Sequence, residues 1–209
     1  MSTLPQFGLT DVDIIKKEVL HQGFLKISRY TLRHQLYEGG SSKEFTREIL
    51  ERNPGVGVLL YDPILDKVVL IEQFRIGCMD NKEGPWVLEL VAGIVDTEES
   101  YSAIAIRESQ EEANVNISGS VLMPVCEYYN SPGGSNEKLI IMCAGVNSEG
   151  VGGVHGLDHE HEDIKTVVLD RAEAETAIKT GKINNAMSII AIQWLSINLE
   201  FVKATLLEQ

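Results

Sequence analysis

Three glutamates, Glu108, Glu111 and Glu112, stand within about one and a half turns of a stretch rich in helix-forming residues. On a helix, Glu108 and Glu112 lie on one face, one turn apart, and Glu111 joins the same edge. Like charges this close repel each other by roughly 0.2–0.5 kcal/mol for each exposed pair. A cation among the carboxylates would explain the crowding, because hard oxygen ligands suit Mg²⁺ or Mn²⁺. Taken alone, the cluster is more typical of a solvated acidic helix face, because charged helix faces are common.

The residues around these glutamates resemble the Nudix box, written G-x5-E-x7-R-E-U-x-E-E-x-G-U, where U is a bulky aliphatic residue. The matching positions are Gly93, Glu99, Arg107, Glu108, Glu111, Glu112 and Val115. Two positions depart from the pattern, since Ser109 replaces an aliphatic residue and Asn114 replaces the second glycine. We expect Asn114 to adopt the left-handed conformation that ends a helix, because asparagine tolerates it best after glycine. Neither departure removes a carboxylate.

The resemblance implies a loop–helix–loop that holds divalent metal ions and an enzyme that cuts a pyrophosphate linkage. It makes Glu108 and Glu112 direct metal ligands, and Glu111 a third catalytic carboxylate that acts through metal or water. The backbone carbonyl of Ala92 is implied as a further metal ligand. The resemblance gives structural roles to Gly93, Glu99 and Arg107. The glycine permits a tight turn, and the arginine pairs with the glutamate or holds the loop.

Other segments are similar to the ADP-ribose pyrophosphatase branch of this family, and the similarity runs from about residue 23 to about residue 200. These segments are 71–75, 89–93, 131–137, 156–164 and 181–186. The similarity implies ADP-ribose as substrate, Mg²⁺ as cofactor with Mn²⁺ as a substitute, and AMP and ribose 5-phosphate as products. Two alternatives stay open. One is another nucleoside diphosphate sugar, such as GDP-mannose or ADP-glucose, and the other is a non-catalytic domain that senses a nucleotide.

The acidic loop 158–163 supplies a water-activating glutamate in this branch. We expect Glu160 to be the general base and Glu162 to bind metal, with the reverse assignment as the alternative. Arg75 is the candidate clamp for the diphosphate, because a guanidinium matches phosphate oxygens with two hydrogen bonds. Glu137 is expected to accept hydrogen bonds from a ribose or from the base. Without the resemblance, the loop is also typical of a solvated acidic surface.

Residues 1–52 are interpreted as a small N-terminal β-unit, and residues 53–209 as the catalytic domain. In the branch that the chain resembles, such a unit swaps across a homodimer and helps to form the adenosine pocket of the partner. The candidate substrate contacts in it are Phe24, which could stack on adenine, and Arg47, Glu51 and Arg52. A strand unit of this size buries little core by itself, which independently favours docking on a partner.

The composition narrows the class of protein. The chain carries 18 basic and 31 acidic residues, a net charge of −13, which disfavours nucleic-acid binding. An anionic ligand would need a local cluster of cations to reverse this field. The three cysteines form no CxxC pair, which fits a reducing compartment. No signal peptide and no run of about 18 apolar residues is found, so we expect a cytoplasmic protein without a membrane span.

The strands and helices expected from the sequence, which would position these residues, indicate an α+β fold. Strands are expected within 13–52 and near 56–61, 68–74, 86–92, 121–128, 139–144 and 164–169. The runs 56–61 and 68–74 flank a turn signal and predict a hairpin. Helices are expected at 97–113, 171–179 and 185–199, with Thr97 or Ser100 as the first N-cap.

On the first predicted helix, the stripe expected to pack on a sheet comprises Ala103, Ile106, Gln110 and Ala113. With the resemblance, these elements imply a Nudix-type α/β/α sandwich with a mixed sheet, preceded by a small N-terminal antiparallel β-unit.

Overall fold

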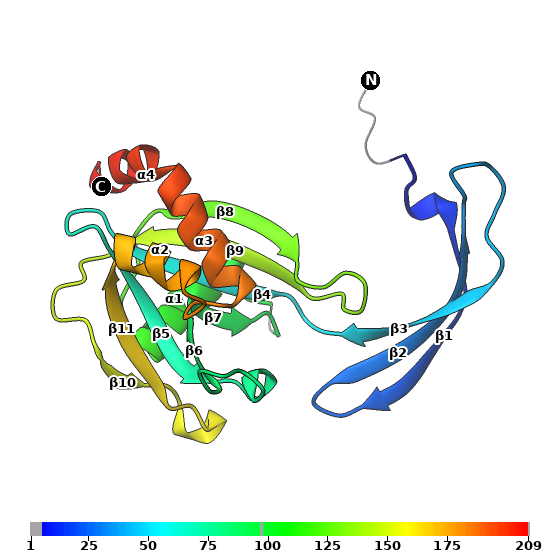
Figure 1. The fold of residues 1–209 in the computed structure, drawn as a ribbon, viewed down its shortest axis with the longest axis horizontal. Helices are drawn as coiled ribbons and strands as arrows, with labels where there is room; N and C mark the ends of the chain where they lie inside the picture. Colours follow the sequence, from blue (N-terminus) through cyan, green and yellow to red (C-terminus); the bar gives the residue numbers. More distant parts are fainter. Residues whose placement is uncertain (1–5, 97, 209) are drawn as a thin grey trace. The chain divides into compact units, whose positions relative to one another are not determined.

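The chain folds into two units in the computed structural model, which describes residues 6–96 and 98–208 (Figure 1). The smaller unit comprises Met1–Asn53 and the loop Tyr129–Glu137, and the larger comprises Pro54–Tyr128 and Lys138–Gln209. Residues 129–137, predicted as part of the larger domain, group with the N-terminal strands, and Leu50 forms a β-bridge with Ser135. Thr97, one of the two candidate N-caps, lies outside the described residues.

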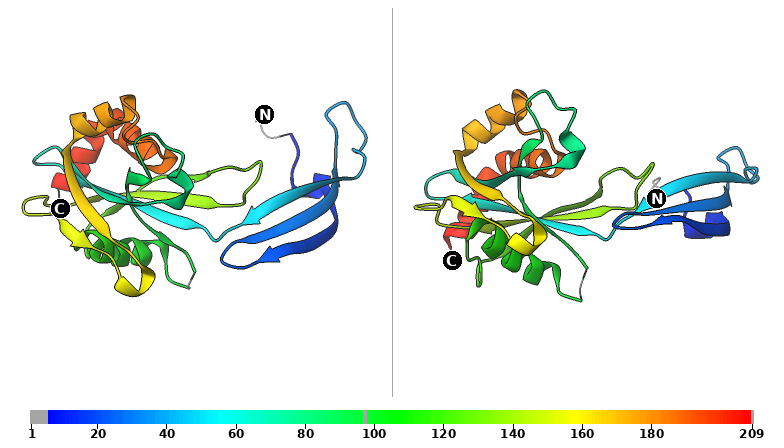
Figure 2. Two further views of the ribbon diagram at one scale, coloured as in Figure 1. Left: turned by 60° about the horizontal axis from the view of Figure 1, so that its bottom comes forward. Right: turned by 90° about the horizontal axis from the view of Figure 1, so that it is seen from below.

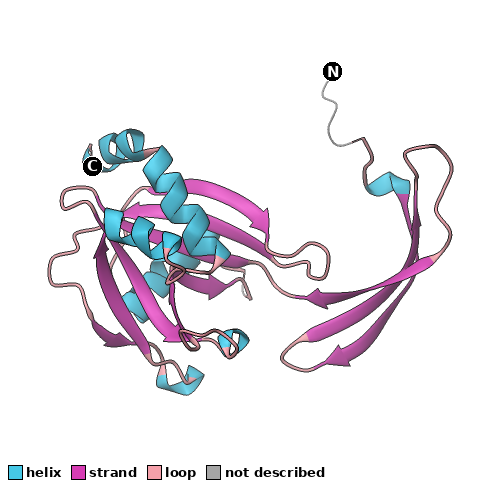
Figure 3. Cartoon of the chain, in the orientation of Figure 1, coloured by secondary structure: helices cyan, strands magenta, loops and turns pink. Residues whose placement is uncertain are grey.

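The smaller unit is a three-stranded antiparallel sheet in the order β1-β2-β3 (Figure 3). Its strands are β1 (Val12–Gln22), β2 (Lys26–His34) and β3 (Phe45–Glu51), preceded by the 3-10 turn η1 (Leu9–Asp11). Among its described residues only Ser28 is buried. Apolar side chains that stay exposed are Val12, Ile14, Ile15, Val19, Leu20, Phe24 and Leu25. The described part of this sheet therefore has no hydrophobic core of its own.

The larger unit is built on an eight-stranded mixed sheet. Its main path is β10-β11-β5-β4-β9-β8, and β6 and β7 pair with β5 and β4 respectively. The strands are β4 (Gly55–Asp62), β5 (Lys67–Phe74), β6 (Trp86–Glu89), β7 (Val91–Ile94), β8 (Leu122–Tyr129), β9 (Lys138–Gly145), β10 (Gly153–His155) and β11 (Ile164–Asp170). Strand β4 runs parallel to β9 and antiparallel to β5 and β7. The predicted hairpin is confirmed as β4 and β5.

Helices cover both faces of this sheet (Figure 2). They are α1 (Tyr101–Ala113), α2 (Arg171–Lys179), α3 (Ala186–Ile197) and α4 (Leu199–Leu207). Side chains of β4 alternate between the two faces. Val58 and Leu60 join the core under α1, whereas Leu59 and Tyr61 join the core under α2, α3 and α4. The predicted α/β/α sandwich with an N-terminal β-unit is confirmed.

Two predicted elements are wrong in detail. The single strand 86–92 is two strands, because β6 pairs with β5 whereas β7 pairs with β4, and the chain changes partner at Leu90. The single closing helix 185–199 ends at Ile197, and α4 follows after a bend of 84°. At that bend the Asn198 side chain donates to the Trp194 carbonyl at 2.8 Å and ends α3.

Within residues 6–96 and 98–208, no single helix is long and apolar enough to cross a membrane. Helices α3 and α4 meet the length and composition criteria only as a pair, across the 84° bend.

Candidate active site

The helix α1 is fixed at both ends by polar caps. Ser100 precedes it and accepts a hydrogen bond from the Ala103 N–H at 3.2 Å, as an N-cap serine does. Asn114 follows it with φ 52° and ψ 37°, in the left-handed region. The predicted conformation of Asn114 is confirmed. The loop–helix–loop of the sequence motif therefore forms with an asparagine at the position usually held by glycine.

The face of α1 that packs on the sheet differs from the predicted stripe. Its buried residues are Ile104, Ala105, Ser109, Glu112 and Ala113, whereas Gln110, which was predicted to pack, is exposed. The prediction left out Ser109 and Glu112, the two polar residues that are buried, and both have hydrogen-bond partners. The Ser109 hydroxyl donates to the Ala105 carbonyl at 2.7 Å, so it occupies a usually aliphatic position without an unmet hydrogen bond.

Glu112 is a buried carboxylate that reaches the backbone of the sheet. It is 3% exposed and accepts a hydrogen bond from the Ala92 N–H of β7 at 2.9 Å. Burial raises the pKa of Glu112 to about 8, although the Ala92 N–H opposes the shift. The negative charges of Glu108 and Glu162 raise it further. The predicted metal ligands Ala92 and Glu112 thus lie side by side.

Glu108 lies directly over Gly93, the glycine that begins the motif. A Cβ atom at Gly93 would be 2.0 Å from Glu108 Oε1, so only glycine leaves room for this carboxylate. Burial raises the pKa of Glu108 to about 7, although Arg107 opposes the shift. Glu111 and Glu162 raise it further. The glycine of the motif therefore leaves room for the Glu108 carboxylate in this position.

Arg107 is the cation at the edge of this carboxylate group. Its Nη1 atom lies 2.8 Å from Glu111 Oε2 and 3.0 Å from Glu108 Oε1. Its Nε atom lies 3.6 Å from Glu99 Oε2. The predicted partner Glu99 is thus within ion-pair distance, but the shorter contacts are made within α1. Arg107 therefore holds Glu108 and Glu111, whereas Glu112 is held by its hydrogen bond from the backbone of β7.

The acidic loop after β10 lies beside α1. The Gly156 N–H donates to the Glu111 carbonyl at 3.2 Å, and Glu162 Oε2 accepts from the Leu157 N–H at 3.1 Å. Gly156 has φ 102°, and a Cβ atom there would be 2.7 Å from the Glu162 Cβ. Glu162 is half-buried, whereas the side chain of Glu160, in the 3-10 turn η3 (Asp158–Glu160), is 55% exposed. The structure therefore brings Glu162 to the carboxylate group and leaves Glu160 in solvent.

Arg75 follows β5 and faces the same side of the sheet as the carboxylates. Its Nε atom donates to Glu89 Oε2 at 2.7 Å, and Gln73 Nε2 donates to the same oxygen at 3.3 Å. The positive charge of Arg75 lowers the pKa of Glu112 in part, so the guanidinium is near the site. The sequence analysis singled out Arg75 but missed Glu89. The available signal was a glutamate at an inward position of an otherwise apolar strand.

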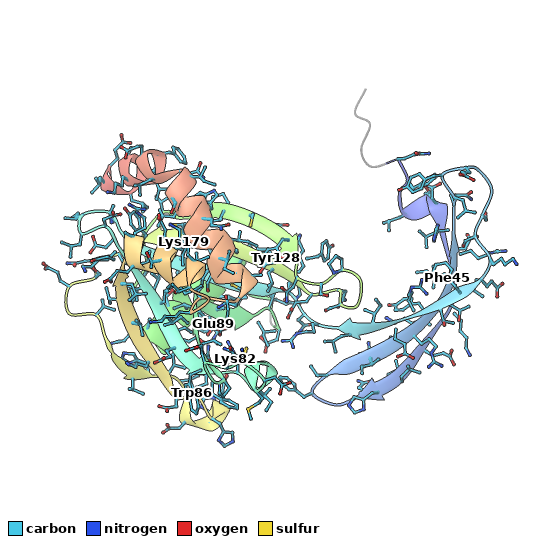
Figure 4. The ribbon with its side chains drawn as sticks, in the orientation of Figure 1. Phe45, Lys82, Trp86, Glu89, Tyr128 and Lys179 are labelled. Atoms are coloured by element: carbon cyan, nitrogen blue, oxygen red, sulfur yellow. The ribbon has the colours of Figure 1, made fainter. Side chains whose placement is uncertain are left out.

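The remaining candidates belong to the smaller unit. Arg52 Nε lies 2.7 Å from Glu137 Oε1, and the Arg52 N–H donates to Asn136 Oδ1 at 2.8 Å. Phe24 is 93% exposed, in the turn after β1. The Arg47 guanidinium lies at 4.7 Å over the ring of Phe45, the residue labelled on the smaller unit in Figure 4. The structure therefore joins Arg52 to Glu137 and leaves Phe24 and Arg47 on the surface.

Glu51 is engaged within the smaller sheet. Its carboxylate contacts Lys17 Nζ at 2.5 Å, Lys26 Nζ at 2.6 Å and the Tyr30 hydroxyl at 3.1 Å. Hydrogen bonds from the two lysines lower its pKa to about 2. The residue thus links all three strands of the unit, and any contact to a ligand would have to displace one of these partners.

The carboxylate group fits a hard divalent cation. Glu108, which is half-buried, and Glu112, which is buried, present oxygen donors, and a nearby cation would lower their raised pKa values. In the described part of the chain, no group of three or more His, Cys, Asp or Glu side chains is arranged to hold a metal ion. The donors that Glu108 and Glu112 offer are carboxylate oxygens, and Mg²⁺ usually binds through one or two carboxylates and completes its shell with waters and substrate phosphates.

Comparison with known proteins shows the same pattern over nearly the whole chain. The model of the NUDIX domain family matches residues 51–187. The chain is 43% identical to the ADP-ribose pyrophosphatase of Escherichia coli strain K12, over 94% of this chain and 93% of that one. It is 38% identical to the ADP-ribose pyrophosphatase of Haemophilus influenzae, over 95% and 92% of the two chains.

The fold also matches a solved structure, described as a crystal structure of ADP compounds hydrolase. The TM-score is 0.71 and the sequence identity 18%, over 94% of this chain and 98% of that chain. At this identity the match concerns the fold, and it includes both units of the chain.

Proposed function

The chain belongs to the Nudix family, and we propose that it hydrolyses the pyrophosphate linkage of ADP-ribose to AMP and ribose 5-phosphate. One observation carries the proposal. The half-buried Glu108 and the buried Glu112 are held against β7 at Gly93 and Ala92, with pKa values raised to about 7 and about 8. Such groups are suited to bind a cation beside a diphosphate. The names of the relatives support ADP-ribose as the substrate.

A divalent cation, Mg²⁺ with Mn²⁺ as a substitute, would be held by Glu108, Glu112, Glu162 and the carbonyl of Ala92. When bound, it neutralises phosphate charge and lowers the pKa of a bound water. It would also reverse the local field of a chain with net charge −13. The cation thus has two roles: it activates the attacking water, and it allows an anionic substrate to bind to an acidic protein.

The side chains divide the remaining work. Arg75 orients the diphosphate through its guanidinium, and Arg107 fixes the carboxylates of Glu108 and Glu111. Water attacks one phosphorus while Glu160 accepts its proton, and the bond from that phosphorus to the bridging oxygen breaks. The exposed position of Glu160 supports this role, because its carboxylate is free to approach a water molecule next to Glu162.

The adenosine end of the substrate is assigned to the smaller unit. The exposed Phe24 supplies a ring for stacking, and Arg47, Glu51, Arg52 and Glu137 supply polar groups. We assign the exposed apolar strands of this unit to a homodimer in which each copy lends its unit to the other. A cytoplasmic location accords with the three cysteines, all of which are free thiols.

The test is release of AMP from ADP-ribose by the purified protein, with Mg²⁺ and with a chelator, beside GDP-mannose and ADP-glucose. We expect metal-dependent cleavage with a clear preference for ADP-ribose. Glu108→Gln is expected to lower turnover by orders of magnitude without unfolding the protein. The matched control is Glu98→Gln, an exposed glutamate before α1, which should keep the wild-type rate. Faster cleavage of another sugar nucleotide would overturn the substrate, and no cleavage of any would overturn the reaction.

A further inference from the structure

Strands β5 and β6 bring a glutamate, a glutamine and an arginine to one face of the sheet. Ile71 is the cross-strand partner of Glu89, and Gln73 is the partner of Val87. Side chains two positions apart on a strand share a face, so Gln73 and Glu89 lie on the face of Ile71, which packs in the core under α1. Arg75 continues the extended backbone of β5, with φ −131° and ψ 112°. All three polar residues thus point toward the side that carries Glu108 and Glu112.

Glu89 holds one end of the Arg75 guanidinium. Glu89 Oε2 accepts from Arg75 Nε at 2.7 Å and from Gln73 Nε2 at 3.3 Å, so both donors bind one oxygen. The bond to arginine is charge-assisted at both ends. The side chain of Glu89 is 19% exposed, against 46% for Arg75. Glu89 is therefore the more buried partner of this ion pair, and Arg75 extends from it toward solvent.

The outer edge of the guanidinium is left for a ligand. With Nε bound to Glu89, the two Nη atoms of Arg75 have no hydrogen-bond partner among residues 6–96 and 98–208. An arginine held in this way presents two parallel N–H donors, which match two oxygens of one phosphate. Because the guanidinium is planar, the bond from Nε to Glu89 also fixes the plane of the two Nη donors.

Glu89 also gives Arg75 a partner outside the carboxylate group. Without it, a long cationic side chain next to Glu108 and Glu112 would gain by pairing with either of them. Such a pair would occupy the oxygens proposed to hold a cation and withdraw the guanidinium from the substrate. Among the residues that the structure describes, the cation in ion-pair contact with Glu108 is Arg107, which lies on α1 itself.

From these contacts we propose that Glu89 is a positioning residue for the hydrolysis reaction: it holds Arg75 in the orientation that binds the substrate diphosphate. The inference rests on the proposed function for the identity of the anion. It assigns no contact between Glu89 and the substrate, because Glu89 acts through Arg75 and is supported by Gln73.

A double-mutant cycle tests this. Steady-state kcat and KM for ADP-ribose with Mg²⁺ are measured for the wild type, Glu89→Ala, Arg75→Ala and the double variant. We expect each single variant to lose about 100-fold in kcat/KM, and the double variant to lose no more than Arg75→Ala alone. Glu89→Gln keeps an oxygen for Arg75 Nε but loses the charge, so it should recover all but about 10-fold of the activity.

Binding gives a readout that does not depend on turnover. The probe is ADP-ribose with a methylene group in place of the bridging oxygen, and its Kd is measured by calorimetry. Glu89→Ala and Arg75→Ala should weaken binding equally, with thermal melting close to wild type. Glu72→Gln is the matched control, because Glu72 lies on β5 beside Gln73 and its carboxylate is in ion-pair contact with Lys165, at 3.7 Å, and not with Arg75.

The outcomes separate the two hypotheses. Losses that multiply in the double variant would show that Glu89 acts independently of Arg75, and would overturn the inference. So would wild-type kinetics in Glu89→Ala. If the wild type cleaves another nucleoside diphosphate sugar, the proposed substrate fails, and the same cycle on that compound decides the role of Glu89. If the wild type cleaves none, the cycle is run on the affinity for Mg²⁺-pyrophosphate, where equal and non-additive losses support the inference and additive losses reject it.

Discussion

Individual side chains at the site are held by contacts that leave little free space. Gly93 and Glu108 illustrate this, since a single methyl group at the glycine would lie 2.0 Å from a carboxylate oxygen. A side chain at this position would displace Glu108, which is also held by Arg107 at 3.0 Å. The geometry of the carboxylate group is thus set by packing as much as by charge.

Gly93→Ala is expected to displace Glu108 and to lower kcat by about 100-fold, since small misplacements of reacting groups cost that much. The helix should remain folded, because the caps at Ser100 and Asn114 are untouched. The measurement is AMP release, together with far-UV circular dichroism. Gly152→Ala is the control, because nothing lies within 4 Å of its Cβ position. Equal activity in the two variants would contradict the packing argument.

A prediction on pH follows from the burial of Glu112. Its pKa is about 8 in the folded protein and near 4.5 in an unfolded chain. Between these values the folded protein binds more protons than the unfolded chain, so the stability of the metal-free protein falls as pH rises from 4.5 to 8. Glu112→Gln removes this loss. In EDTA the variant should melt above the wild type at pH 8.5 and close to it at pH 4.5.

The experiment is a thermal melt in EDTA at a series of pH values. Glu98→Gln, on the exposed segment before α1, is the control and should follow the wild type throughout. A wild type that melts higher than Glu112→Gln at pH 8.5 without metal would show that Glu112 is not a destabilising buried charge. Added Mg²⁺ should raise the wild-type melting temperature more at pH 8.5 than at pH 6, because protons compete for the same oxygens.

Among the elements, the end of β4 remote from Gly93 and Ala92 is held by a buried carboxylate. Asp62 is 2% exposed and its two oxygens accept from the Ile64, Leu65 and Ser148 N–H groups and from the Ser148 hydroxyl. Burial alone would raise the pKa of Asp62, but these hydrogen bonds outweigh it and hold the pKa below the usual range. The contact ties the loop after β9 to the β4–β5 turn.

Asp62→Ala should destabilise the protein by about 2–3 kcal/mol, because it leaves buried donors without partners. Once folded, the variant should keep wild-type kcat, since Asp62 lies at the opposite end of β4 from the strand pair of Ala92 and Gly93. Urea unfolding and AMP release measure the two effects. Glu149→Ala, exposed in the same loop, is expected to change neither. A drop in kcat without loss of stability would place Asp62 in the active site.

Elements defined by local signals could be predicted from the sequence, and those defined by distant partners could not. The caps of α1 and the hairpin of β4 and β5 depend on neighbouring residues, and both were predicted. The change of partner at Leu90 arises because residues before it pair with β5 and residues after it pair with β4. No local sequence pattern indicates this change. In the same way, the spacing within one helix revealed Glu108 and Glu112. Glu89 was missed because its contacts with Gln73 and Arg75 arise only when β6 pairs with β5.

At the scale of the whole molecule, the smaller unit carries apolar strands with little to cover them. Ile14 is 61% exposed and Val19 is 52% exposed, on the same strand. Exposed apolar patches of this kind mark sites of association, which supports the proposed homodimer. The unit also carries most of the residues proposed to contact adenosine, so association and substrate affinity are expected to change together.

The variant Ile14→Lys/Val19→Lys is expected to shift the protein from dimer to monomer and to raise KM for ADP-ribose with less effect on kcat. Sedimentation velocity and steady-state kinetics measure this. Lys43→Glu, an exposed change of charge in the loop before β3, is the control. A monomeric wild type, or a monomeric variant with unchanged KM, would contradict the shared adenosine pocket.

The parallel pairing of β4 with β9 has a consequence for biosynthesis. Gly55 lies at the start of the larger unit, and its partner in the ladder is Leu139. The central strand therefore stays without one neighbour until the ribosome has released the chain through β9, and its apolar residues must be kept from other chains meanwhile. Pairings this distant in sequence close slowly. We expect the closing of β4 on β9 to limit the rate of refolding, and chaperone demand to be greatest while the nascent chain ends between these two strands.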